Sequence, residues 1–140
     1  MESAGENVLK ESKKSTKRKK RQQTPNQYKT KLMGQIHGEM RRIAITEHPS
    51  CVCCGSKENL QGGHVIPKKI SSNVRFDLMN VFTQCRTCNY LHQFKPHLYI
   101  NWYIKTYGAE SYNELVEKSK ITKSWKIFEL EELLERYKQL

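Results

Sequence analysis

The chain has 140 residues, of which 36% are hydrophobic, and it carries a formal net charge of +11 at pH 7. This length favours a single domain, and no apolar run approaches the ~20 residues of a membrane-spanning helix. The N-terminus is polar and then basic, which argues against a secretory signal, so we expect a cytoplasmic protein with no membrane partner.

Positive charge is unevenly distributed along the chain. Residues 1–31 hold ten Lys/Arg and three Glu, and residues 32–109 hold nine basic and four acidic side chains. Residues 110–140 are nearly balanced, with six basic and seven acidic side chains. This gradient favours a polyanionic partner near the N-terminal half, above all nucleic acid.

Residues 1–27 have almost no apolar side chains, and we expect them to form a disordered basic arm. The run KKSTKRKKRQQ is interpreted as a phosphate-binding arm, with a solvated tail or a nuclear localisation signal as alternatives. The side chains expected to contact phosphate are Lys17, Arg18, Lys19, Lys20 and Arg21.

Residues 28–48 are predicted to form an N-terminal helix. Their apolar side chains recur at spacings of four, four and three, which places them on one helix face. Pro49 ends this helix because the residue before a proline is pushed out of the α region. The apolar face consists of Leu32, Ile36, Met40 and Ile43.

Residues 49–108 are predicted to form a module around the cysteines, with a helix after it. Short β-like pieces at 65–66 and 81–83 would flank a loop at 67–79. A short helix would then run from Asn89 toward Phe94.

The next predicted helix begins at Pro96 and ends at Gly108, positions that suit a first turn and a cap. Its aromatic side chains follow helical spacing, so we expect them mainly in the core, with base stacking as the alternative. These side chains are Tyr99, Trp102 and Tyr103.

Residues 109–140 are predicted to form C-terminal helices. One helical stretch covers 113–120, and the last helix carries an apolar face. These helices could pair in a homodimer or dock a replication or recombination protein. The apolar face of the last helix consists of Ile127, Leu130, Leu133, Leu134 and Tyr137.

Two Cys-x-x-Cys pairs, Cys51/Cys54 and Cys85/Cys88, are the strongest motif in the chain. In a reducing compartment paired cysteines more often bind a metal than form disulfides. A two-residue spacing lets a tight turn present both sulfurs to a tetrahedral ion, so we predict one structural zinc held by all four thiolates. The alternative is four unliganded thiols, and Cys53 is expected to stay free.

His64 and Asn89 are the candidates for chemistry. A neutral imidazole at His64 could take a proton from an attacking water near pH 7, the alternative being a structural histidine. The carbonyl oxygen of the Asn89 side chain could bind Mg²⁺ or Mn²⁺, the alternative being a helix N-cap. Asn80 could brace the hairpin with its amide.

Four basic side chains of the loop and the second cysteine pair are candidates for contacts with the phosphate backbone, with surface solvation as the alternative. They are Lys68, Lys69, Arg75 and Arg86.

The pattern GGH…VRF…N…QCRTCN, followed by an aromatic-rich helix that ends in glycine, resembles the phage NinG/Rap recombination-protein family. More broadly it is similar to the zinc-stapled branch of HNH, or ββα-metal, endonucleases. The resemblance runs from about Cys51 to the C-terminus. It implies an α+β fold: a zinc-stapled ββα-metal core with flanking helices, following the disordered basic arm.

The same resemblance implies roles for three residues: His64 as general base, Asn80 as the central HNH-type asparagine and Asn89 as a metal ligand. One position departs from the pattern. Many HNH nucleases have an aspartate ligand directly before the histidine, where this chain has Gly63. His92, three residues after Asn89, is the candidate replacement, with an exposed or capping histidine as the alternative.

These observations predict a phage-encoded, metal-dependent DNA endonuclease of HNH type in the bacterial host's cytoplasm. It would hydrolyse phosphodiesters in branched or recombination-intermediate DNA with Mg²⁺ or Mn²⁺. The alternative is a non-catalytic zinc-knuckle protein that binds DNA or acts as a recombination adaptor.

Overall fold

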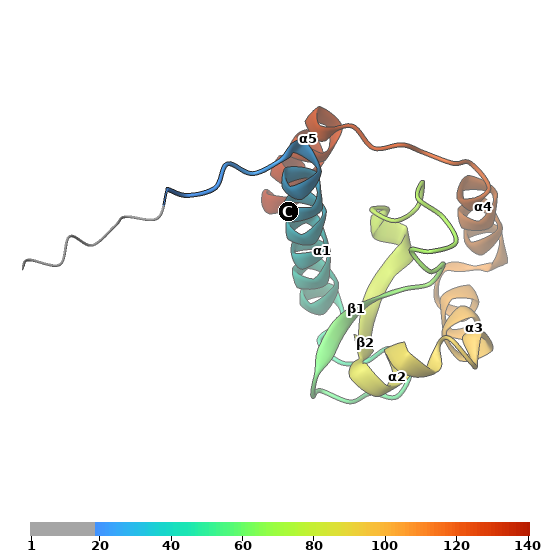
Figure 1. The fold of residues 1–140 in the computed structure, drawn as a ribbon. Helices are drawn as coiled ribbons and strands as arrows, with labels where there is room; N and C mark the ends of the chain where they lie inside the picture. The colour runs from blue at the N-terminus through green and yellow to red at the C-terminus, as the bar shows by residue number, and fades with distance from the viewer. Residues whose placement is uncertain (1–18) are drawn as a thin grey trace, which may run out of the picture.

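A two-stranded antiparallel hairpin lies at the centre of residues 19–140, the part of the chain that this computed structural model describes (Figure 1). Strand β1 (Leu60–His64) pairs with β2 (Val81–Cys85), in a register that sets Leu60 opposite Cys85 and His64 opposite Val81. Helices surround the hairpin, so the predicted α+β class is confirmed. No helix in the described residues is long and apolar enough to cross a membrane.

The first strand lies earlier than predicted, because Val65 and Ile66 follow β1 and do not form it. The backbone of Ile66 bonds to a side chain and not to a strand: its N–H donates to Asn80 Oδ1 (2.8 Å), and its carbonyl accepts from Asn80 Nδ2 (3.0 Å). β-branched residues such as Val65 and Ile66 favour a strand. Here, however, the Asn80 amide bonds to the backbone N–H and carbonyl of Ile66 that a neighbouring strand would otherwise use. His64 is therefore the last residue of β1.

Helix α1 (Pro25–Glu47) covers one side of the hairpin. Thr24 caps it in a capping box with Gln27, and Pro25 occupies its first turn, both of which favour a helix start. The helix thus begins at Pro25 and not at residue 28, so the last residues assigned to the basic arm are helical. It ends before Pro49, as predicted.

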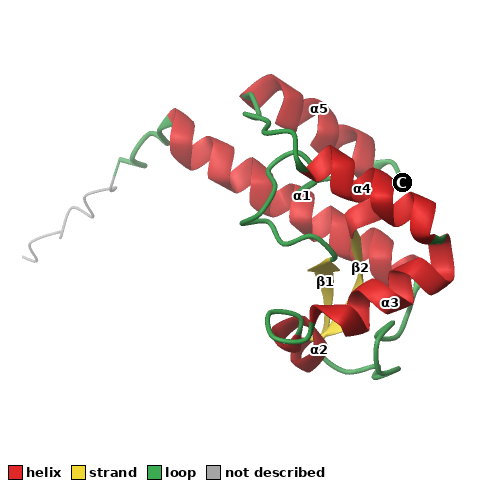
Figure 2. Ribbon diagram, turned by 90° about the vertical axis from the view of Figure 1, so that its right-hand side faces the viewer, coloured by secondary structure: helices red, strands yellow, loops and turns green. Residues whose placement is uncertain are grey.

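Helix α5 (Ile127–Lys138) packs along α1, and the two helices form a first core with the loop between the strands (Figure 2). The apolar face expected on the last helix is therefore covered within the chain itself. The buried members of this core are Leu32, Ile36, Met40, Phe76, Val81, Leu130, Leu133, Leu134 and Tyr137.

A second core lies on the other side of the hairpin, under α3 (Pro96–Tyr107) and α4 (Ala109–Ser119). Tyr99 and Tyr103 are each 1% exposed, which confirms that these tyrosines pack inside the protein. Gly108 ends α3 as predicted, and its φ of +93° is a conformation that glycine adopts without strain.

Helix α2 (Arg86–Leu91) follows β2 without a break and begins earlier than predicted. Cys85 is its N-cap, and the Cys85 sulfur accepts from the Cys88 backbone N–H at 3.4 Å. The helix therefore starts directly after the first cysteine of the pair, and Asn89 lies inside it.

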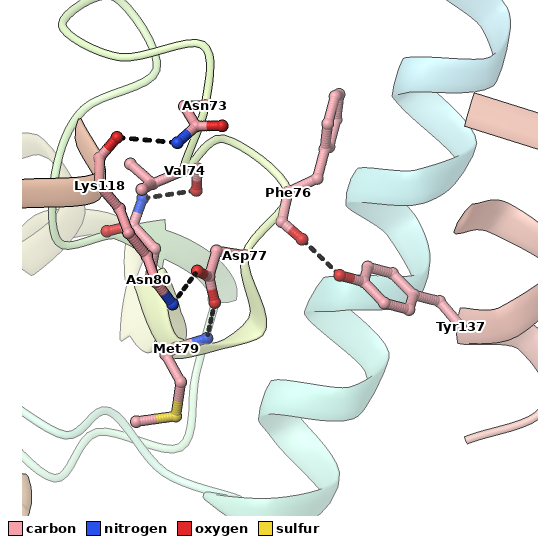
Figure 3. Close-up of polar contacts among 8 residues, drawn as sticks. All are labelled: Asn73, Val74, Phe76, Asp77, Met79, Asn80, Lys118 and Tyr137. Carbon is pink, nitrogen blue, oxygen red and sulfur yellow. Dashed lines mark hydrogen bonds and ion pairs between the residues drawn. The ribbon is translucent and has the colours of Figure 1, made fainter. Parts of the chain in front are cut away.

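The loop between the strands is fastened from several directions (Figure 3). Asn73 Nδ2 donates to the carbonyl of Lys118 at the end of α4 (2.8 Å), and the Tyr137 hydroxyl of α5 donates to the carbonyl of Phe76. From inside, Asn80 donates to the carbonyl of Val74 (3.1 Å) in addition to its bonds with Ile66. Both C-terminal helices thus fix the loop that faces β1.

Asn80→Ala should lower the free energy of unfolding by about 3 kcal/mol, because it leaves buried backbone groups of Ile66 and Val74 without partners. Urea unfolding followed by circular dichroism measures this loss. The matched control is Asn73→Ala, which removes one exposed hydrogen bond of the same loop and should cost about 1 kcal/mol or less. Equal losses in the two variants would show that Asn80 does not brace the loop.

Candidate functional site

Four cysteine sulfurs form a cluster between the turn that precedes β1 and the start of α2. The sulfurs of Cys51, Cys54, Cys85 and Cys88 all lie within 4.8 Å of one another, and those of Cys54 and Cys85 are 3.6 Å apart. Tetrahedral zinc with Zn–S bonds of about 2.3 Å needs sulfurs about 3.8 Å apart. The four cysteines could thus hold a metal ion such as zinc, as their spacing predicts.

Local backbone structure explains how the first pair converges. The Gly55 N–H donates to the Cys51 carbonyl (2.8 Å), and Gly55 has a φ of +80°, which favours glycine. This tight turn directs Cys51 and Cys54 to one point. Cys53 lies outside the cluster, as expected, and its sulfur accepts from Gln84 Nε2 at 3.4 Å.

A pocket of about 490 Å³ lies beside the cluster, between β1, α2 and the loop that follows β1. It contains six of the residues that the sequence singles out, and its lining includes three basic side chains and no Asp or Glu. A cationic lining of this kind suits a phosphate group. The six residues are His64, Lys68, Lys69, Arg86, Asn89 and His92.

His64 is held in one orientation at the edge of this pocket. Its Nε2 lies 2.9 Å from the backbone carbonyl of Arg75 and must donate to it, so Nδ1 carries the free lone pair. Burial, together with the positive charges of Lys68 and Arg75, lowers the pKa of His64 to about 4. The imidazole is therefore neutral near pH 7 and can accept a proton.

His37 of α1 is a neighbour of His64 that the sequence did not single out. The two ring centroids are 5.2 Å apart, and Arg75 Nε donates to His37 Nε2 at 3.1 Å. Burial and the nearby charges of His64, Lys68 and Arg75 lower the pKa of His37 to about 3. In the sequence, the one indication of this position is that His37 directly follows Ile36, which lies on the buried face of α1.

Arg75 therefore contacts both histidines, one through its carbonyl and the other through its guanidinium. It does not line the pocket, and its predicted contact with the DNA backbone stays a prediction.

Asn89 projects from the interior of α2 into the pocket. Its Nδ2 donates to Gln61 Oε1 at 2.9 Å, and no hydrogen bond within the described residues occupies its Oδ1. The alternative role as an N-cap is wrong, because Cys85 holds that position. The carbonyl oxygen of the side chain thus remains available to a ligand.

Asn80 and His92 are both buried, and the side chain of each bonds to backbone groups that follow β1. Asn80 is 0% exposed, lies outside the pocket, and uses its amide for the bonds to Ile66 and Val74. His92 donates from Nε2 to the Val65 carbonyl (2.8 Å), and its Nδ1 is buried without a partner. This geometry gives Asn80 a bracing role and does not favour His92 as a metal ligand.

Gly63 lies where a side chain would collide with Gln84. A Cβ atom at this position would lie 1.9 Å from Oε1 of Gln84, which is itself 1% exposed. Successive residues of a strand also point to opposite faces, so a side chain here would point away from His64. The packing of Gln84 therefore disfavours an aspartate at the position where many HNH nucleases have one.

Two residues of the predicted phosphate-binding arm, Lys17 and Arg18, lie outside the described residues. Lys19, Lys20 and Arg21 are exposed and precede α1, at the end of that helix remote from α2 (Figure 1).

These features define a small α+β protein whose central hairpin has, at one end, a cluster of four cysteines that could hold a metal ion, beside a cationic pocket. A family model described as bacteriophage lambda NinG protein matches residues 2–140, and the chain belongs to this phage protein family. The NinG family named by the sequence resemblance is thus confirmed, whereas the wider likeness to HNH endonucleases stays a prediction. No curated protein and no solved structure matches the chain.

Cys85→Ser should abolish metal binding, because a hydroxyl is a poor substitute for a thiolate ligand of zinc. We expect one zinc per chain in the unaltered protein by plasma emission spectrometry after purification without chelator. Cys53→Ser is the matched control and should keep its metal, since the Cys53 sulfur lies outside the cluster. A folded, metal-free protein, or metal loss in the control variant, would contradict this assignment.

Gly63→Ala should lower the free energy of unfolding by about 2 kcal/mol, because the new methyl group collides with the buried Gln84 side chain. Gly63→Ala combined with Gln84→Ala should cost less than the two single changes together, since the second change makes room for the methyl group. Gly34→Ala is the control: nothing lies within 4 Å of its new Cβ, and it should be neutral or stabilising. Simple additivity of the Gly63 and Gln84 changes would refute the close contact.

Proposed function

We propose that this NinG-family protein is a metal-dependent DNA endonuclease of HNH type that acts on branched or recombination-intermediate DNA. The observation that supports it most is the pairing of two groups in one cationic pocket: a neutral, oriented His64 and an Asn89 with a free carbonyl oxygen. The preference for branched DNA rests on the resemblance to the NinG/Rap family alone.

His64 is the general base of the proposed reaction. Its Nε2–H is fixed by the Arg75 carbonyl, so Nδ1 is the atom that takes a proton from the attacking water. A pKa of about 4 makes a weak base in the free protein. A phosphate group bound in the pocket would raise this pKa toward neutral, because its negative charge favours the imidazolium.

Asn89 is the protein ligand for Mg²⁺ or Mn²⁺ in this proposal. A divalent ion held by Asn89 Oδ1 would stabilise negative charge at the scissile phosphate and the leaving oxygen. Mg²⁺ keeps several waters and often uses only one or two protein ligands together with substrate phosphates. The amide oxygen of Asn89 fits that habit, and an ion there would bind well only when DNA is present.

Lys68, Lys69 and Arg86 position the DNA backbone in the pocket. The exposed basic residues ahead of α1 extend the same sequence-independent attraction. A zinc ion held by the cysteine cluster would be structural in this proposal: it would tie the turn before β1 to α2 and so keep Asn89 beside β1.

A second candidate function is a non-catalytic DNA-binding or recombination adaptor protein. It is favoured by a pocket that has three cations and no carboxylate, together with the packing that closes the Gly63 position. Such a pocket holds phosphate without a catalytic metal.

DNA nicking distinguishes the two functions. The purified zinc-containing protein, incubated with plasmid or four-way junction DNA, should cut in Mg²⁺ or Mn²⁺ and not without added divalent ion. His64→Ala should lower the cutting rate about 100-fold or more, which is the usual contribution of a general base, and Asn89→Ala should weaken activation by Mg²⁺.

Both variants should still bind DNA, and His97→Ala is the control because this exposed histidine of α3 lies outside the pocket. An uncut substrate with either ion would favour the adaptor function. Equal cutting by His64→Ala would refute the assignment of the base.

A further inference from the structure

Two aromatic side chains are exposed at the end of α2. Tyr90 is 61% and Phe94 is 65% exposed, and their ring centroids are 5.5 Å apart with a 63° angle between the ring planes. The tyrosines of the next helix, Tyr99 and Tyr103, are by contrast buried in the second core. Neither Tyr90 nor Phe94 belongs to a core of the protein, so packing does not explain their presence.

The surroundings of these rings are charged. Tyr90 lines the same pocket as His64 and Asn89, and Arg86 of α2 lines it too. Lys95 follows Phe94 directly and is exposed. Arg86 and Lys95 thus bracket the two rings in sequence, and Arg86 shares the pocket with Tyr90. Such surroundings suit a strand with phosphates and flat bases better than an apolar protein surface.

We propose that Tyr90 and Phe94 form an aromatic platform: an unpaired nucleobase of a DNA strand stacks on the Tyr90 ring, and Phe94, whose ring is inclined at 63° to it, holds the Tyr90 ring in place. The phosphates flanking this base lie along Lys69 and Arg86 in the pocket. The inference rests on DNA as the partner, and it deepens the proposed function by naming the feature of the substrate that the site recognises.

The platform selects DNA in which at least one nucleotide beside the pocket is unpaired. In a continuous duplex each base is already stacked between neighbours, and exposing one face to Tyr90 requires unstacking it. At a branch point or in a single strand this cost is small. Every base has a π-face, so the platform adds affinity without specifying a sequence.

The test measures binding by fluorescence anisotropy in the His64→Ala background, without added divalent ion, so that cutting does not interfere. The probes are a labelled thymidine oligonucleotide of about 12 nucleotides and a chain of equal length whose central nucleotides are abasic. Tyr90→Ala should weaken binding of the first probe about 5- to 50-fold, with a smaller effect on the abasic probe. Phe94→Ala should act in the same direction.

Two controls separate stacking from general damage. Tyr90→Phe retains the ring and should bind within about 2-fold of the background protein. Phe128→Ala removes an aromatic side chain that is 58% exposed on α5, outside the pocket, and should leave binding unchanged. An equal effect of Tyr90→Ala on both probes, or no effect on either, would overturn the platform.

The outcomes also separate the platform from the nuclease. A wild-type protein that leaves DNA uncut, together with a Tyr90 effect confined to the probe with bases, would support the platform and refute the nuclease. Cutting by the wild-type protein, together with unchanged binding by Tyr90→Ala, would support the nuclease and refute the platform.

Discussion

The cluster of four sulfurs joins the turn that precedes β1 to the first turn of α2, and the pocket depends on this junction. A two-stranded hairpin is marginally stable by itself, and here the cluster closes its open end. Four sulfurs within 4.8 Å of one another repel as thiolates unless a cation lies between them. A metal ion held there would fix the direction of α2, which sets Asn89 beside Gln61 of β1 and Tyr90 at the edge of the pocket.

The charges of the pocket make its chemistry depend on what it binds. His64 and His37 stay neutral because they are buried among positive groups, and Arg75 contacts both. The pocket lining has no carboxylate, so negative charge for a divalent ion must come from the bound phosphate. A bound phosphate would make His64 a better base and would complete the surroundings of an ion at Asn89. In the proposed function, therefore, binding of DNA and assembly of the site are one event.

Local patterns in the sequence were enough to predict which four cysteines cluster, where most helices lie and to which family the chain belongs. The Cys-x-x-Cys spacing describes a turn that needs only neighbouring residues, and the structure brings the two pairs together. Helical spacing predicted the buried faces of α1 and α5, as well as the burial of Tyr99 and Tyr103. The pattern around Cys85 and Asn89 was specific enough to name the NinG family.

Tertiary structure alone decided the features that depend on partners distant in the chain. Strand β1 ends at His64 because the Asn80 side chain takes over the hydrogen bonds of Ile66, an exchange that strand propensity cannot anticipate. A side chain at Gly63 is disfavoured because the Gln84 side chain, on the neighbouring strand, fills the space that it would need. His37 gained its place beside His64 in the same way, by the packing of α1 on the hairpin. The sequence determined which chemical groups are present and which local turns and helices adjacent residues form. Long-range packing decided which atoms of those groups remain free for chemistry.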